Sequence, residues 1–132
     1  MNIELIPLQV HGDSRGSLIA LEDHKNVPFD IRRIYYVFGT LSGVSRGFHA
    51  HKALRQMVIP VRGSCQFLLD DGVNRVTVEL NDPTSGLMVE KMIWHEMHNF
   101  SDDCVLVVLA DAHYDESDYI RNYDDFRKLV GG

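Results

Sequence analysis

The chain has 132 residues, of which 45% are hydrophobic, and this suits one domain over residues 1–132 with a modest core. Its formal net charge of -6 argues against a nucleic-acid partner, because binding to a phosphate backbone depends on a cationic surface. Any anionic ligand must therefore be held by a local group of arginines.

The chain also lacks the segments that direct a protein to a membrane or out of the cell. No apolar run approaches the roughly 20 residues of a membrane helix, and the N-terminus has no basic and apolar signal pattern. Cys65 and Cys104 lie in apolar runs, which favours buried free thiols over a disulfide. We expect a cytoplasmic protein that does not bind membranes.

Short β-rich runs follow one another with turn residues between them. They lie at residues 3–8, 17–22, 31–38, 47–51, 56–61, 65–70, 74–80, 86–90, 93–100 and 104–110. Asp71-Gly72 predicts a tight hairpin between two of these runs, since Asp-Gly supplies the positive φ angles of such a turn. The pattern predicts an all-β fold, and a closed double-sheet jelly-roll barrel is favoured because it hides its strand edges.

The period changes to a helical one near the C-terminus. Tyr119, Tyr123, Phe126 and Val130 recur at helical spacing within residues 116–130, and Ser117 or Asp115 is available as a cap. We expect one short C-terminal helix whose aromatic stripe packs against the barrel.

Two histidines in the run 47–51 are the first candidates for chemistry. Residues i and i+2 of a strand point to the same face, so His49 and His51 are expected to project together. Gly43, His49, His51 and Gly63 keep the spacing of the first cupin motif, G-x5-H-x-H-x4-E-x6-G, but Gln56 stands in the glutamate position. This match supports a cupin barrel, also called a double-stranded β-helix.

The second cupin motif, G-x5-P-x-G-x2-H-x3-N, is largely lost. Counted from Gly86, its later positions hold Met92, Trp94, Met97 and Ser101. Two of the four usual metal ligands are therefore absent, and iron, manganese or zinc needs three or four suitable donors. We predict a metal-free site.

A shifted frame leaves one alternative open, because His95 and His98 lie nearby and either could replace a lost ligand. Without a cation, paired imidazoles are suited to proton transfer, since their unperturbed pKa lies near 6.5. The pattern predicts an acid/base catalyst that loses activity as the pH falls through the histidine range.

Other residues are candidates for binding the substrate. Strand alternation places Arg33 and Tyr35 on one face of the run 31–38. Trp94 suits either core packing or stacking on a base or sugar ring. The candidate substrate-binding set is Arg15, Arg33, Arg46, Gln56, Trp94, His95 and Arg121.

The segments DSRGSL, IRRIYYVF, RGFHAHK, LDDG, WHEMHNFSDDCVLVVLA and YDESDYIRNYDDF together resemble the bacterial dTDP-4-keto-6-deoxyglucose 3,4-ketoisomerases, sugar-nucleotide cupins of the WxcM-like group. The likeness runs from about residue 13 to residue 126. It implies a metal-free homodimer, often with exchanged N-terminal strands, that acts on a dTDP-linked 4-keto-6-deoxy sugar without a cofactor.

The resemblance also implies roles for individual residues. His49 would be the main base, His51 a proton shuttle or an oxygen-side donor, and Tyr35 a hydroxyl near the sugar. The product would be the 3-keto sugar, with the galacto configuration at C4 favoured. Three alternatives stay open: a sugar-nucleotide epimerase, a metal-dependent cupin oxygenase, and a sugar-nucleotide-binding module without activity.

Overall fold

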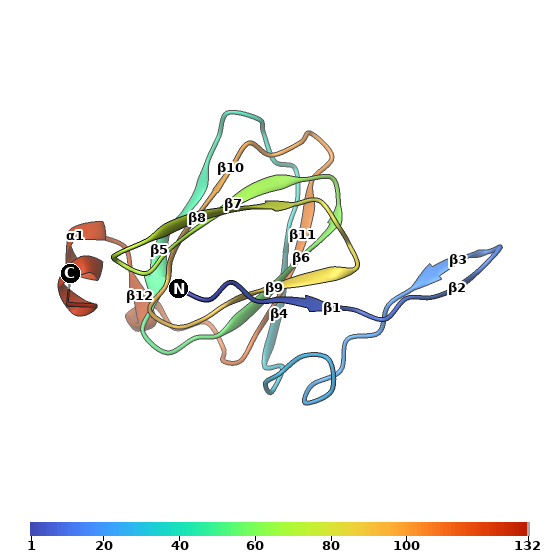
Figure 1. Ribbon diagram of the computed structural model, residues 1–132, viewed down its shortest axis with the longest axis horizontal. Helices are drawn as coiled ribbons and strands as arrows, with labels where there is room; N and C mark the ends of the chain where they lie inside the picture. The colour runs from blue at the N-terminus through green and yellow to red at the C-terminus, as the bar shows by residue number, and fades with distance from the viewer. Residues whose placement is uncertain (132) are drawn as a thin grey trace.

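Two five-stranded antiparallel sheets wrap around a common interior in the computed structural model, which describes residues 1–131 (Figure 1). The first sheet has the order β1 (Leu5–Pro7), β9 (Ser85–Val89), β6 (Gln56–Arg62), β11 (Val105–Ala110) and β4 (Arg33–Val37). The second has the order β12 (Tyr119–Ile120), β5 (Arg46–His51), β10 (Trp94–His98), β7 (Cys65–Asp70) and β8 (Arg75–Leu80). These sheets confirm the predicted all-β, double-sheet architecture.

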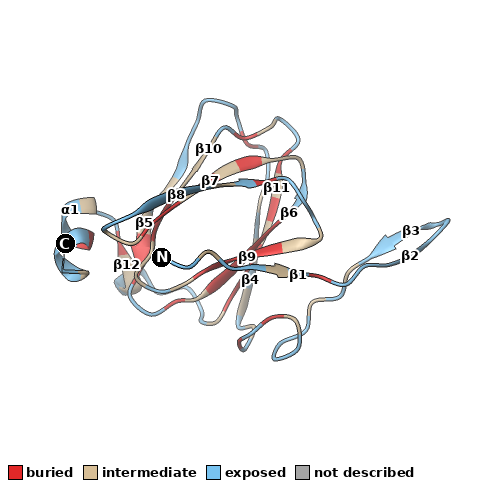
Figure 2. Ribbon diagram, in the orientation of Figure 1, coloured by how far each residue is buried: buried red, intermediate tan, exposed pale blue. Residues whose placement is uncertain are grey.

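A small hairpin stands apart from both sheets. It consists of β2 (His11–Asp13) and β3 (Gly16–Leu18), and it projects from the barrel at the end of the N-terminal segment (Figure 1). The residues of both strands are exposed (Figure 2). The predicted run 17–22 is thus a strand only at its start.

Strand alternation decides which side chains enter the core. In β11, Leu106 and Val108 pack between the two sheets, while Leu109 faces the other side of its own sheet. That outer side is covered by the segment between β3 and β4, which buries Val27 and Phe29 there. The interior is therefore left to side chains from alternate positions of the two sheets.

The hairpin that joins β7 to β8 follows the prediction from Asp71-Gly72. Gly72 has a φ of 95°, and the Asp71 carboxylate accepts hydrogen bonds from the backbone N–H groups of Val73 and Asn74. A side chain at position 72 would also meet Val130, 2.5 Å from the added Cβ. Glycine is thus required both by the turn and by the C-terminal segment above it.

The C-terminal helix is shorter than predicted. Residues Glu116–Asp118 form a 3-10 turn, Tyr119–Ile120 form β12, and only Tyr123–Leu129 form the helix α1. The prediction that the helix begins near residue 116 is wrong, because β12 pairs with β5 and Asn122 caps α1 by accepting from the backbone N–H of Asp125.

The expected packing of this helix is confirmed. Tyr123 and Phe126 lie against Trp94, with ring centroids 5.3 and 5.9 Å from the indole, and Phe126 is fully buried. Cys65 and Cys104 are buried free thiols, also as predicted. Within residues 1–131 no helix has the length and apolar character needed to cross a membrane.

Candidate active site

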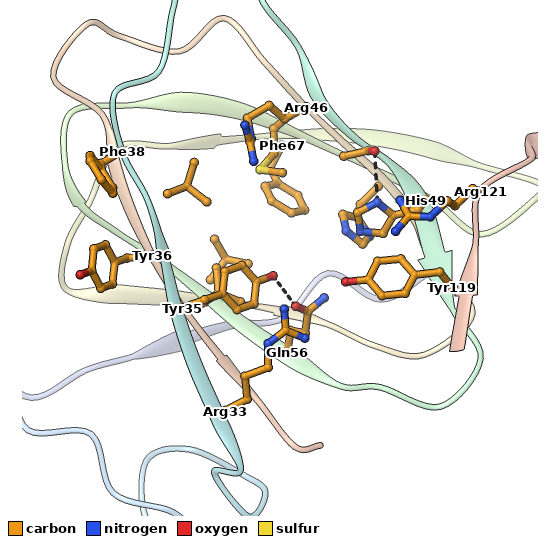
Figure 3. A pocket seen from close by; sticks show the side chains of 16 residues that line it. Arg33, Tyr35, Tyr36, Phe38, Arg46, His49, Gln56, Phe67, Tyr119 and Arg121 are labelled. Atoms are coloured by element: carbon orange, nitrogen blue, oxygen red, sulfur yellow. Dashed lines mark hydrogen bonds between the residues drawn. The ribbon is translucent and has the colours of Figure 1, made fainter. Parts of the chain in front are cut away.

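A cavity of about 630 Å³ is lined by residues of both sheets, and its size lies in the range of small-molecule sites (Figure 3). Most of the predicted site residues line it: Arg33, Tyr35, Arg46, His49, Gln56, His95 and Arg121. They come from β4, β5, β6, β10 and the residue that follows β12.

Three histidines form a cluster at one end of this cavity. As strand alternation predicts, the rings of His49 and His51 are neighbours, with centroids 5.1 Å apart. His95 lies opposite His49 in the pairing of β5 with β10, and these two centroids are 4.5 Å apart. One ring nitrogen from each of the three residues lies within 4.8 Å of the other two.

Gly47 allows β5 and β10 to approach closely beside this cluster. It has a φ of 93°, and a Cβ there would lie 3.0 Å from the carbonyl oxygen of His95. The pairing of the two strands also shifts register between His95 and Glu96. The glycine and the irregular pairing together set how near the His49 and His95 rings come.

His51 lies deeper than the prediction placed it. It is 3% exposed and lines a neighbouring cavity of about 240 Å³ rather than the main one. Its Nδ1 is 3.1 Å from Oδ2 of Asp118. The expectation that both histidines face a single cavity is therefore corrected: His49 faces the main cavity, and His51 lies behind it.

The hydrogen bonds fix the same tautomer in all three histidines. Nδ1 of His49 is 3.1 Å from the carbonyl oxygen of Gly47, and Nδ1 of His95 is 3.4 Å from that of Ile93. Carbonyl and carboxylate oxygens only accept hydrogen bonds, so each Nδ1 carries the proton. Each Nε2 is then left with a lone pair.

Burial keeps these imidazoles neutral. Burial, together with the positive charge that His51 carries when protonated, lowers the pKa of His49 to about 4. It lowers the pKa of His95 to about 3 and also lowers that of His51, where the Asp118 carboxylate acts in the opposite direction. At neutral pH the cluster therefore consists of proton acceptors.

Tyr35 and Gln56 form a polar pair on the opposite wall. The Tyr35 hydroxyl donates to Oε1 of Gln56 over 2.6 Å (Figure 3). Burial raises the pKa of Tyr35 to about 12, so this hydroxyl keeps its proton at neutral pH. Gln56 thus holds a hydroxyl in place from the position where the cupin motif has a glutamate.

Three arginines give the cavity a positive lining. Among the described residues, Arg33 and Arg46 form no salt bridge, whereas Arg121 pairs with Glu116 at 2.8 Å. The Arg121 guanidinium also lies 4.2 Å from the centre of the Tyr119 ring. The two unpaired guanidinium groups are available to an anionic ligand.

Sequence reasoning missed two residues of the site, Asp118 and Tyr119. Tyr119 lines the cavity, with its ring centroid 5.0 Å from His49 and 4.4 Å from His51. Both residues belong to the segment that was predicted to be helical. The pairing of Tyr119 with His51 across β12 and β5 brings both Asp118 and Tyr119 to the histidines. No local sequence pattern predicts this pairing.

Two predicted substrate-binding residues do not lie in this cavity. Trp94 is 3% exposed and packs under α1, because it precedes His95 in β10 and neighbouring strand residues point to opposite faces. Arg15 lies at the turn of the exposed β2–β3 hairpin, where it pairs with Asp13 at 2.6 Å. The stacking role for Trp94 is corrected to core packing, and Arg15 is outside this chain's own site.

Comparison with known proteins gives the class of this site. Residues 1–131 match the family FdtA, described as WxcM-like, C-terminal. A curated relative from Aneurinibacillus thermoaerophilus, TDP-4-oxo-6-deoxy-alpha-D-glucose-3,4-oxoisomerase, is 53% identical over 89% of this chain and 85% of its own length. The chain therefore belongs to the FdtA family of WxcM-like sugar-nucleotide 3,4-ketoisomerases.

Solved structures agree with this assignment. A 3,4-ketoisomerase from Helicobacter canadensis has a TM-score of 0.97 and 45% identity, covering 100% of this chain and 99% of its own. WlaRB, a TDP-quinovose 3,4-ketoisomerase from Campylobacter jejuni, has a TM-score of 0.92 and 49% identity, covering 96% and 98%. RmlC epimerase from Mycobacterium tuberculosis shares the fold, with a TM-score of 0.75 and 23% identity over 89% of this chain and 66% of its own. This likeness confirms the cupin-type barrel.

Proposed function

We propose that this protein converts dTDP-4-keto-6-deoxyglucose into the 3-keto isomer with the galacto configuration at C4. The observation that carries the isomerisation is the neutral imidazole of His49, whose Nδ1 proton is held by Gly47 and whose Nε2 is left as a base at the cavity wall. The galacto preference rests on the sequence resemblance. A histidine variant of the enzyme from Thermoanaerobacterium thermosaccharolyticum, 40% identical to this chain, was solved with TDP-4-keto-6-deoxyglucose.

The carbon-bound proton is the first to move in the proposed reaction. The C4 ketone acidifies the hydrogen on C3, and Nε2 of His49 takes it while the electron pair forms a C3–C4 double bond and an oxyanion at C4. A proton is then returned to C4, and the electron pair of the double bond goes to that carbon. A positioned imidazole contributes roughly a hundred- to ten-thousand-fold to such a transfer.

The oxygen-bound proton must move as well. The C3 hydroxyl loses its proton as C3 becomes a ketone, and the C4 oxygen gains one as it becomes a hydroxyl. Tyr35 stays protonated at neutral pH, and its single hydroxyl hydrogen would turn from Oε1 of Gln56 to the C4 oxygen. It gives this proton to the oxyanion and takes back the proton that leaves the C3 hydroxyl. His51, beside His49 but behind the main cavity, serves as a shuttle for the proton that His49 carries. The sugar ends with the same atoms and electrons, so the reaction needs no redox cofactor.

The nucleotide portion is assigned to the arginines of the cavity. Arg33 and Arg46 carry charges without a carboxylate partner in the described chain, and a diphosphate would neutralise both. Arg121 is placed near the sugar end, because it stacks on Tyr119 beside the histidines. His95 supports the base by packing against it.

A homodimer would explain the projecting hairpin. Within residues 1–131 the exposed β2–β3 strands pair only with each other, and the edge strand β4 exposes Ile34 and Tyr36, which are 62% and 65% accessible. In a dimer with exchanged N-terminal strands the hairpin would lie on the partner. Arg15 would then bind substrate in the partner's cavity rather than in its own.

The main experiment follows the reaction in deuterated water. The pure protein is incubated with dTDP-4-keto-6-deoxyglucose, and the product is identified by NMR. We expect a 3-keto sugar labelled with deuterium at C4, and a small H4–H5 coupling in unlabelled water for the galacto product. A large coupling would indicate the gluco product, and inversion with the ketone still at C4 would indicate an epimerase.

The proposed exchange of hairpins between two subunits is tested by mixing two variants. His49→Asn removes the base, and Arg15→Ala removes the hairpin charge. After denaturation and refolding of an equal mixture, half of the dimers contain both chains. Each mixed dimer has one complete site if the hairpins are exchanged, so activity should reach about one quarter of the wild-type value. Activity no higher than the mean of the two variants alone would contradict the exchange.

A further inference from the structure

We propose that His49, His51 and His95 form a binding site for one divalent ion of the zinc class, and that this ion blocks the proposed proton transfer when bound. The blocking rests on the proposed function, whereas the binding does not. Imidazole nitrogen is the ligand that zinc, cobalt(II), nickel(II) and copper(II) accept, while magnesium and calcium prefer oxygen.

The orientation of the three rings is the first support. Each Nδ1 donates to an oxygen acceptor, which is Gly47, Asp118 or Ile93, so the lone pair of each ring is on Nε2. Within residues 1–131 no hydrogen bond to these three Nε2 atoms is found. Histidines that bind metals are held in the same way, with the second nitrogen bonded to a carboxylate or a carbonyl.

The spacing of the donors is the second support. Three nitrogens around a tetrahedral ion at 2.0–2.1 Å are about 3.4 Å apart. One ring nitrogen of each histidine here lies within 4.8 Å of those of the other two. Side-chain rotations that close up to about 1.4 Å would complete the site. His49 is only half-buried, so its ring has room to make most of this movement.

The surroundings set the character of the site. Three protein ligands leave the fourth position open toward the cavity, as in catalytic rather than structural zinc sites. Arg33, Arg46 and Arg121 oppose a cation, so we expect weaker binding than at a closed four-ligand site. Bound metal would occupy the lone pair that His49 needs for proton abstraction, and it would inhibit.

The test uses the full chain, freed of metal with a chelator, and titrates it with zinc by calorimetry and with cobalt(II) by visible absorption. We expect one ion per chain, the absorption of tetrahedral cobalt(II), and inhibition that the chelator reverses. Changing His49, His51 or His95 to Gln should weaken zinc binding at least tenfold, and Asp118→Asn should weaken it about 10- to 100-fold. The control His24→Asn removes an exposed histidine on a loop, and Asn accepts its φ of 57°.

The possible outcomes bear differently on the metal site and on the proposed isomerase activity. Zinc binding that survives all three histidine changes, or that is lost in His24→Asn, would overturn the site. An active protein that binds no zinc or cobalt would overturn it too and leave the isomerase intact. A metal-free protein without activity that gains it with zinc would retain the site and overturn both the inhibition and the metal-free reaction.

Discussion

Asp118 accepts a hydrogen bond from Nδ1 of His51 over 3.1 Å, and this contact joins a segment near the C-terminus to the histidine cluster. The same carboxylate accepts from the backbone N–H groups of Ala53 and Leu54. Asp118 thus fixes both the turn after β5 and the tautomer of the histidine that ends it. It is a positioning residue, because it acts through His51.

Asp118→Asn should slow isomerisation about 100-fold or more with little change in KM. An amide can keep the bond to Ala53 and turn its NH2 group toward His51, which would move the ring proton from Nδ1 to Nε2. Nitrogen NMR of the histidines would detect the changed tautomer. Asp115→Asn, an exposed carboxylate in the same segment that accepts from Ser117, is the matched control and should retain full activity. An unchanged tautomer with a normal rate would remove this role from Asp118.

The pH dependence of kcat/KM should have its acid limb near pH 4. His49 accepts a proton only when neutral, and burial lowers its pKa to about 4, so the base form persists well below the ordinary value of 6.5. This places the limb lower than the histidine range expected from the sequence. Circular dichroism at each pH separates loss of the base from loss of the fold. A limb near 6.5 would argue against a desolvated His49 as the base.

Acid should destabilise the fold between about pH 6.5 and pH 3. The pKa of His95 is about 3 when folded and near 6.5 when unfolded, so the unfolded state binds more protons in this range and stability falls as the pH falls. Each such histidine costs up to about 1.4 kcal/mol per pH unit. Urea unfolding should show a shallower pH dependence for His95→Gln than for the wild type. Equal slopes would mean that His95 is not buried as a neutral ring.

Arg46→Ala should weaken TDP binding about 10- to 100-fold, because one charge-assisted hydrogen bond contributes roughly 1.5–3 kcal/mol. Calorimetry with TDP measures this directly. Arg62→Ala is the control, since Arg62 is exposed and pairs with Asp103 at 3.6 Å outside the cavity. If both variants bind TDP as the wild type does, the nucleotide does not use Arg46.

Trp94→Phe should lower stability and leave TDP affinity unchanged. The indole is buried against α1 and donates from Nε1 to Glu96 over 2.8 Å, so its loss should cost about 1–3 kcal/mol. Denaturant unfolding and TDP titration measure the two quantities separately. A tenfold loss of affinity in a folded variant would restore the stacking role that the cavity geometry removes.

Local spacing was enough to predict the barrel and the centre of its site. The alternation in β4 and β5 places Arg33 with Tyr35 and His49 with His51, and the cupin spacing adds Gln56. The same rule separates Trp94 from His95, which cannot both face the cavity. Alternation could have excluded one of the two, and the packing of α1 against Trp94 shows which one.

The positions of Asp118 and Tyr119 in the site could not be predicted, because they depend on contacts between segments that are distant in the sequence. Tyr119 has helical spacing to Tyr123 and Phe126, so local periodicity favours a helix there. The pairing of β12 with β5 overrides that preference and brings Asp118 into hydrogen-bond contact with His51. Pairing between distant strands of this kind cannot be predicted from a short window of sequence.

At Gly47 the strands β5 and β10 lie so close that an added methyl group would come within 3.0 Å of the His95 carbonyl oxygen. The reactive rings are therefore spaced by a residue that has no functional group at all. An alanine there would be strained at a φ of 93° and would press against β10, so the ring positions depend on a residue that a search for catalytic groups would overlook.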